Sequence, residues 1–206
     1  HSHYFPLVLD RGRLRDGRLF LITSLFDEFP LATVIGADPV PDRLVMDLRI
    51  AIEIARALEE IHALDIFHVD LNPMNVLYRT GPNRPVIRIV DFESSYERRR
   101  HLKGEFYSPP TTPGFSAPEV STQAPDARAD VYSLGAVLYA MVGGYRWTSS
   151  VDVRGRVAAD DDLDAPLKAA LLRAVDPTPA RRFPTIAALK DALGAYLEEI
   201  WPGRDW

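Results

Sequence analysis

The chain has 206 residues, enough for one large domain or two small ones, and 47% of them are hydrophobic, as in an ordinary globular core. It has no cysteine, which excludes a disulfide framework and thiolate metal sites and is compatible with a cytoplasmic protein. The net charge of -5 argues against a broad nucleic-acid-binding surface, and no apolar run approaches the roughly 20 residues of a membrane span.

The first third of the chain predicts a β-hairpin followed by a long helix. Short apolar runs at residues 7–9 and 19–25 flank DRGRLRDGR, whose Asp-Gly and Arg-Gly steps are typical of a tight connection between strands. From Pro41 and Asp42 onward, apolar residues recur at helical spacing through residue 64. The apolar face is wide, so we expect this helix to be largely buried.

The rest of the chain predicts a second hairpin and then helices. Residues 76–78 and 86–90 read as strands around the turn TGPNRP. Residues 91–128 show no clear periodicity, and a connection of that length in one domain suggests a function. Helices are predicted at residues 129–142, 165–175 and from 184 onward, the first of them apolar on nearly every side. We find no internal repeat and no domain linker.

The stretch HVDLNPMN, residues 68–75, places an acid and an amide on the loop between the long helix and the second hairpin. Asp91 follows the return strand of that hairpin, in IVDFESS. Two acids and an amide at neighbouring hairpin ends could hold a hard divalent cation through oxygen, with one acid left to accept a proton. Such a set suits phosphoryl transfer, in which catalysis is mostly positioning and charge neutralisation. The alternative is that these residues only form turns, where Asp and Asn are common.

At this point the chain resembles the larger, C-terminal lobe of the eukaryotic-type protein kinase family, of the bacterial Ser/Thr kind. The family's catalytic loop, H-R-D-L-K-x-x-N, is similar to residues 68–75, and its D-F-G triplet is similar to DFE at residues 91–93. TPGFSAPE, DVYSLG and RRFPT resemble further family segments in the same order. The resemblance covers nearly the whole chain, and the motifs are specific as a set although each alone is weak.

The resemblance implies a protein kinase-like α+β fold and a division of roles. The fold would be a mainly helical C-lobe with short β-hairpins at residues 25–206, preceded by a remnant of the N-lobe sheet at residues 1–24. Asp70 would be the catalytic base, with Thr112 supporting it and the substrate. Asn75 and Asp91 would bind Mg²⁺, and Arg182 would pair with Glu119. His68 would be a packed, structural histidine.

The resemblance also implies an ATP site and a protein substrate. Thr23 would lie at the back of the adenine pocket, the backbone of Ser24 and Phe26 would bind adenine, and Leu77 would form the pocket floor. We therefore expect Mg-ATP as cofactor and a protein carrying Ser or Thr hydroxyls as partner, with no nucleic acid and no membrane span in this segment.

Several positions depart from the family pattern. Val69 replaces the loop arginine, so control by phosphorylation of the substrate-facing segment is not expected. Asn72 replaces the loop lysine, which removes a positive charge from the catalytic set. Glu93 replaces the glycine of D-F-G and adds a negative charge near the metal site. Arg98, Arg99 and Arg100 are interpreted as a solvated charge run.

The family's glycine-rich loop and strand lysine find no counterpart. Nothing matches G-x-G-x-x-G, and the lysines of the chain are Lys103, Lys168 and Lys190, all after the catalytic loop. We expect the chain to start inside the small lobe, with most of that lobe missing and little activity in the isolated chain. Two alternatives stay open: a pseudokinase that binds or scaffolds without phosphoryl transfer, and a small-molecule kinase, which Asn72 and Glu93 would also fit.

Overall fold

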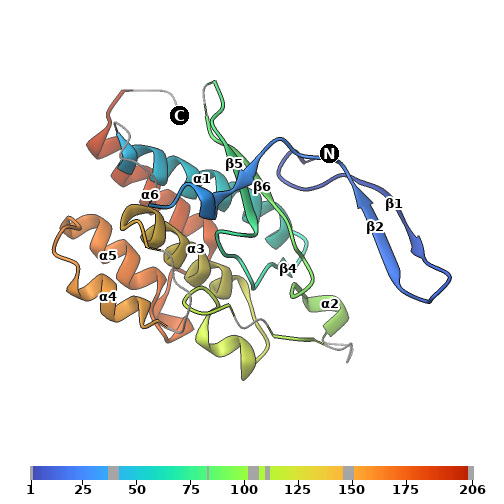
Figure 1. Cartoon of the computed structure of the whole chain (residues 1–206). Helices are drawn as coiled ribbons and strands as arrows, with labels where there is room; N and C mark the ends of the chain where they lie inside the picture. Colours follow the sequence, from blue (N-terminus) through green and yellow to red (C-terminus); the bar gives the residue numbers. More distant parts are fainter. Residues whose placement is uncertain are drawn as a thin grey trace.

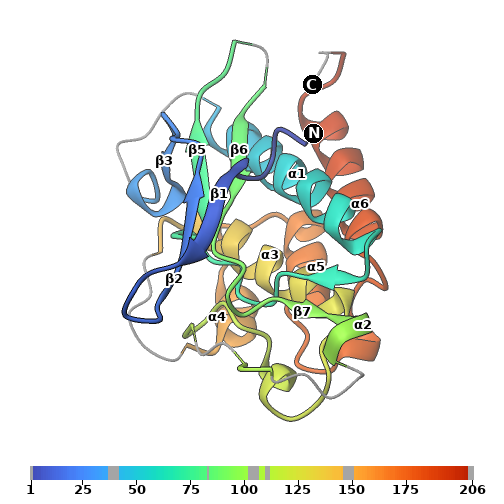
Figure 2. The ribbon, with the colours of Figure 1, turned by 90° about the vertical axis from the view of Figure 1, so that its right-hand side faces the viewer.

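The computed structural model describes residues 2–36, 42–82, 84–101, 107–109, 112–145 and 151–203. Its helices form one packed group, whereas the first hairpin extends away from them (Figure 1). Seen after a turn of 90°, the hairpins lie on one side of the molecule and the helices behind them (Figure 2). The structure is thus the mixed, mainly helical arrangement that the sequence predicts.

Three small antiparallel sheets are present among the described residues. Strands β1 (Val8–Arg13) and β2 (Leu19–Thr23) form the first hairpin. Strands β3 (Phe29–Pro30), β5 (Val76–Arg79) and β6 (Val86–Ile89) form a sheet in the order β3-β5-β6. Strands β4 (Ile66–Phe67) and β7 (Tyr96–Glu97) form the third. The two predicted hairpins are therefore confirmed, while the short strands β3, β4 and β7 were not predicted.

The long helix α1 (Arg43–His62) packs against α3 (Ala127–Val142) and α6 (Ile186–Ile200), and it carries a wide buried face, as its sequence predicts. Asp42 precedes it in a left-handed conformation, with φ 57° and no side-chain capping bond. The Asp start is therefore not a standard N-cap. At the other end, Asp65 adopts φ 59° and turns the chain into β4, directly before the catalytic loop.

The central helix α3 (Ala127–Val142) is buried on nearly all sides, as predicted. Its N-cap is Asp126, whose side chain accepts a hydrogen bond from the Arg128 amide. Gly135 permits close packing with α5 (Ala165–Ala174), because a Cβ at this position would lie 2.7 Å from the Cβ of Ala174. The α3 helix is thus a central element on which α1, α5 and α6 pack.

The C-terminal helix α6 and several short helical elements complete the fold. α6 (Ile186–Ile200) was predicted and is capped by Thr185, which accepts from the Ala188 amide. α4 (Val153–Ala159) was missed because it is short, contains a glycine and buries only Val153 and Val157. The remaining elements are α2 (Arg98–His101) and the 3₁₀ turns η1 (Leu31–Thr33), η2 (Pro118–Ser121) and η3 (Pro179–Arg181). No helix among these described residues is both long and apolar enough to cross a membrane.

Candidate active site

The backbone of the catalytic loop is held by Asp130, a fully buried carboxylate on α3. Its Oδ2 accepts the His68 amide at 2.9 Å, and its Oδ1 accepts the Val69 amide at 2.7 Å. His62 Nε2 lies 2.7 Å from the same Oδ2. These bonds fix Val69 at φ 67°, a conformation that a β-branched residue adopts only under constraint. The loop that carries Asp70 is therefore anchored in the core of the helical lobe.

The protonation of Asp130 follows from the same contacts. Burial acts to raise its pKa, but the hydrogen bond and charge of His62, the charge of His68 and the Val69 amide outweigh burial and leave the pKa below its ordinary value. Asp130 is thus an anion at neutral pH, which suits a carboxylate that accepts several N–H bonds.

His68 is fully buried and joins the loop to the end of β6. Its Nε2–H donates to the carbonyl of Val90 at 3.1 Å. Its ring contacts that of Phe92 edge to face, with the centroids 4.9 Å apart, and Phe92 in turn contacts Phe5 at 5.7 Å. The predicted structural role of this histidine agrees with its burial, and it brings residues 90–92 beside the loop.

Asp70 carries the one carboxylate of residues 68–75, and Thr112 binds it directly. The Thr112 hydroxyl donates to Asp70 Oδ1 at 2.6 Å, which is the contact that the resemblance implies. Ser116 lies behind Thr112: its hydroxyl accepts the Thr112 amide at 3.0 Å and is 3.5 Å from the same Oδ1. Both hydroxyls therefore engage one carboxylate oxygen, and Oδ2 has no partner among the described residues.

Two asparagines hold the backbone of Asp70. Asn72 Nδ2 and Asn75 Nδ2 each donate to the Asp70 carbonyl at 3.0 Å. The Asn72 Oδ1 accepts the Met74 amide at 2.9 Å, so both ends of this side chain organise the loop. The Asn75 Oδ1 has no such bond within the described chain, and Asn75 is 8% exposed. An amide oxygen thus remains beside Asp70 that could bind a cation.

Asp91 stands at the exit of β6, close to the loop through main-chain bonds. The Val90 amide donates to the Asn75 carbonyl at 3.0 Å, and Asp91 itself is exposed with φ 64°. The donors thus available, an exposed carboxylate and a free amide oxygen, are hard oxygen ligands of the kind that Mg²⁺ prefers. No group of three or more His, Cys, Asp or Glu suited to a metal occurs in the described residues. A cation here would therefore need oxygen ligands beyond these two side chains.

Thr23 and Ser24 lie at the end of the first hairpin. Thr23 pairs with Val8, and the Ser24 amide donates to the Leu7 carbonyl at 2.9 Å. The Ser24 carbonyl and the Phe26 backbone have no partner in the part of the chain that is described. These main-chain groups are available for hydrogen bonds to a ligand.

Arg88, a residue that sequence reasoning missed, contacts Phe26 and is the strand partner of Leu77. The Arg88 guanidinium lies 5.0 Å from the Phe26 ring centroid and donates to Glu28 at 3.2 Å, and Leu77 pairs with Arg88 across β5 and β6. It also donates to the His3 carbonyl at 2.7 Å. Arg88 therefore fixes the segment after β2 over the sheet that carries Leu77.

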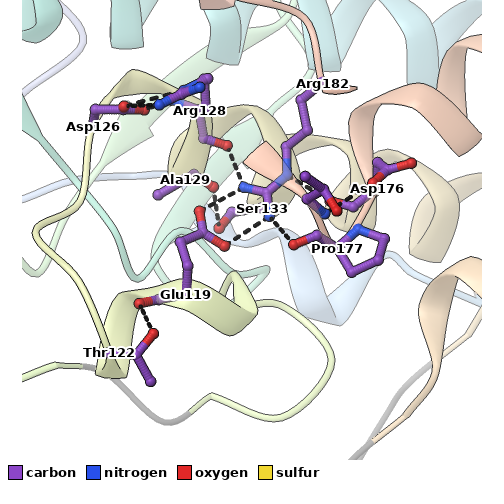
Figure 3. Close-up of polar contacts among 10 residues, drawn as sticks. Glu119, Thr122, Asp126, Arg128, Ala129, Ser133, Asp176, Pro177 and Arg182 are labelled. Carbon is purple, nitrogen blue, oxygen red and sulfur yellow. Dashed lines mark hydrogen bonds and ion pairs between the residues drawn. The ribbon is translucent and has the colours of Figure 1, made fainter. Parts of the chain in front are cut away.

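The ion pair predicted between Glu119 and Arg182 is present and buried (Figure 3). Arg182 Nη1 and Nη2 donate to the two Glu119 oxygens, each at 2.7 Å. The same guanidinium reaches the carbonyls of Arg128 and Asp176 at 2.8 and 2.7 Å. This pair ties the end of residues 91–119 to the helical core and so supports the position of Thr112.

Asp130 and Ser116 also escaped the sequence analysis as site residues. An acid inside a helix that is apolar on nearly every side is itself a signal, because a buried carboxylate needs partners. Ser116 offered no comparable signal, since a serine in a loop rich in Ser, Thr and Pro has no distinguishing pattern. Its role depends on contacts that form only in the folded chain.

Comparison with known proteins agrees with this geometry. The family model described as "Protein kinase domain" matches residues 15–173. Serine/threonine-protein kinase Pkn1 of Myxococcus xanthus is 29% identical over an aligned length of 203 residues, and the alignment covers 88% of this chain and 28% of that protein. The DNA damage-responsive serine/threonine-protein kinase RqkA of Deinococcus radiodurans is 37% identical over 142 residues, 66% of this chain and 20% of its own length.

Solved structures show the same fold. The crystal structure of a single-substitution mutant of the Mycobacterium tuberculosis PknI kinase domain has 26% identity and a TM-score of 0.70, covering 95% of this chain and 72% of that one. The chain spans less than a third of the length of the two curated relatives. The family match covers most of the chain and the motifs meet in one site, so this chain belongs to the protein kinase family.

Proposed function

We propose that the chain is the catalytic lobe of a serine/threonine protein kinase that transfers the γ-phosphoryl group of Mg-ATP to a protein hydroxyl. The observation that carries the proposal is the state of Asp70: Thr112 binds Oδ1 at 2.6 Å, whereas Oδ2 has no partner among the described residues. A base must present an oxygen to the proton that it accepts, and its orientation must be fixed. The bond from Thr112 supplies that orientation.

The residues around Asp70 divide the remaining work. Asn75 and Asp91 would hold Mg²⁺, which when bound neutralises the charge of the transferring phosphate. Asp70 would orient the substrate hydroxyl and accept its proton. The carbonyl of Ser24 and the backbone of Phe26 would bind adenine over Leu77, with Thr23 at the back, and Arg88 would hold Phe26 in place.

The first hairpin supports the view that residues 1–24 are part of a larger small lobe. Apolar side chains on β1 and β2 are exposed, among them Leu19 at 74% and Leu21 at 60%. Exposed apolar strands of this kind are normally covered by further structure. We therefore propose that activity needs additional strands over this hairpin.

A second candidate function is a binding module that transfers no phosphate. The observation in its favour is Asn72, whose Nδ2 and Oδ1 are both used within the loop. The position therefore offers neither a cation nor a free polar atom to a phosphoryl group. Val69 and Glu93, which stand where the family pattern has arginine and glycine, also favour a binding module.

The deciding experiment measures transfer of labelled phosphate to the protein itself, to a generic protein substrate and to a metabolite panel, in the longest natural form of the protein. The Asp70→Asn variant should lower the rate roughly 100-fold or more, because a positioned base contributes about that much. Asp161→Asn, at a fully exposed carboxylate, is the matched control and should leave the rate unchanged.

The outcomes separate the candidate functions. Equal rates for Asp70→Asn and the natural protein would refute Asp70 as the base. Nucleotide binding without transfer to any acceptor would favour the binding module. Transfer confined to metabolites would identify a small-molecule kinase instead.

A further inference from the structure

Four rings lie together beside the catalytic loop: Phe67, Tyr96, His101 and Tyr107, here called the aromatic clamp. Phe67 immediately precedes His68, and the other three belong to the segment after Asp91 that leads to Thr112. The clamp thus joins the catalytic loop to the segment that supports its aspartate.

The ring geometry is favourable at each contact. Tyr96 stacks on Phe67 with centroids 6.5 Å apart and on His101 at 4.7 Å. Tyr107 meets Tyr96 edge to face at 5.2 Å and His101 at 5.6 Å. Offset-stacked and edge-to-face pairs at these distances are the stabilising arrangements of aromatic rings. Tyr107 therefore contacts two of the other rings of the clamp.

Main-chain hydrogen bonds join the part of the chain that carries the clamp to the strand before the catalytic loop. Phe67 pairs with Tyr96 between β4 and β7, and the Arg98 amide donates to the Asp65 carbonyl at 3.0 Å. His101 Nδ1 accepts the Glu97 amide at 3.0 Å. Tyr96 is 5% exposed, so the start of the segment is anchored in the core.

The Tyr107 hydroxyl identifies what holds this residue in place. The oxygen is buried and has no hydrogen-bond partner in the described chain. Burial raises the pKa of Tyr107, and the charges of Asp130 and Asp70 raise it further. A negative charge on this oxygen is therefore disfavoured, so a phosphate is unsuited to it, and within the described chain the side chain is held by the contacts of its ring.

We propose that Tyr107 is a positioning residue whose ring, within the aromatic clamp, holds residues 107–109 against the catalytic loop without a phosphate. Val69 fits this arrangement, because its fully buried apolar side chain offers no cation to a phosphate on the segment. The effect on transfer rests on the proposed function, in which Thr112 orients Asp70. The effect on amide exchange in the clamp residues does not depend on the proposed function.

The test compares Tyr107→Leu with Tyr107→Phe by two measurements: amide hydrogen exchange of residues 96–101 and 107–108, and the rate of phosphate transfer. Tyr107→Leu should speed exchange there and lower kcat roughly 10-fold or more with little change in KM for nucleotide, because small misplacements of catalytic groups are costly. Tyr107→Phe should keep both close to natural values, with an equal or higher Tm, since the hydroxyl that it removes is unpartnered in the described chain.

Controls separate the clamp from general damage. Tyr196→Leu removes a buried phenol ring on α6 and should lower Tm without faster exchange in the clamp residues. If Tyr107→Leu does not fold, His101→Ala removes a half-buried ring of the clamp instead. It should also speed amide exchange and lower kcat, but less than Tyr107→Leu would. Phosphatase treatment of the natural protein should alter neither readout.

The proposal is overturned if Tyr107→Leu exchanges like the natural protein, if Tyr107→Phe is as defective as Tyr107→Leu, or if dephosphorylation loosens the segment. Faster exchange in Tyr107→Leu together with full transfer in Asp70→Asn would instead support the clamp and reject the proposed function.

Discussion

Arg182 uses every nitrogen of its guanidinium. Nε and the two Nη groups reach the Glu119 carboxylate and the carbonyls of Arg128, Asp176 and Pro177, and the guanidinium carbon lies 4.9 Å from the Tyr132 ring centroid. Lysine could not reproduce this, because an ammonium has fewer donors and no planar fork. The fixed geometry explains why an arginine occupies this buried position.

Arg182→Met should reduce the free energy of unfolding by about 3–5 kcal/mol, because Glu119 would keep a nearly buried, unpaired charge. For a chain of this size the Tm should fall by on the order of 10 °C, measured by calorimetry. Arg18→Met, in an exposed pair with Asp16, is the matched control and should cost less than about 1 kcal/mol.

The double variant Glu119→Leu with Arg182→Met should recover part of the loss, since it leaves no unpaired buried charge. A single Arg182→Met variant as stable as Arg18→Met would contradict this account of the buried pair.

Helix α1 contains an acid that opposes folding at neutral pH. Asp47 is 1% exposed and is bound by Arg43 Nε at 2.9 and 3.1 Å. Burial raises the pKa of Asp47 to about 6, although the charge and hydrogen bond of Arg43 act to lower it. The unfolded value is about 3.9, so between these two pKa values the folded state binds the proton more tightly. This group therefore lowers stability as the pH rises through 6.

Asp47→Asn should raise the free energy of unfolding at about pH 7.5 by on the order of 1–2 kcal/mol, because no charge is then buried. At about pH 3, below the unfolded pKa of about 3.9, the advantage should vanish, since Asp47 is then protonated in both the folded and the unfolded state. Urea unfolding at both pH values measures the difference between the two proteins. A constant difference across the range would show that Asp47 does not titrate near 6.

At the scale of the whole molecule, the exposed hairpin β1–β2 stands out from a well-packed helical lobe (Figure 1). Leu19 and Leu21 are 74% and 60% exposed on β2, next to a strand edge. Exposed apolar edges promote association with other chains. In the absence of covering structure, this hairpin should therefore mediate self-association of the 206-residue chain.

Replacing Leu19 and Leu21 by Lys should reduce concentration-dependent association in analytical ultracentrifugation and leave the Tm unchanged, because neither side chain belongs to the core. Leu64→Lys, at a residue 65% exposed beyond the end of α1, is the control and should not alter association. If the Leu19/Leu21 variant and the natural chain associate equally, a surface other than this hairpin mediates the self-association.

The sequence by itself determined the elements whose signals are local. Helical spacing of apolar residues predicted α1, α5 and α6, a stretch apolar on nearly every side predicted α3, and short apolar runs around turn residues predicted the two hairpins, because such patterns depend only on which parts of an element are buried. The ordered motifs also predicted the family and placed Asp70 next to Thr112, a contact that the structure contains.

Only the tertiary structure decided how the site is held. Asp130 is far from Asp70 in the sequence yet fixes its loop, and Ser116, Arg88 and Tyr107 act through contacts with distant segments. Short elements such as α4 and β7 likewise form because neighbouring parts of the chain bury or pair them, not because of their own propensity. Local patterns record which side of an element is buried, whereas the partner that buries it is set by the packing of the whole chain.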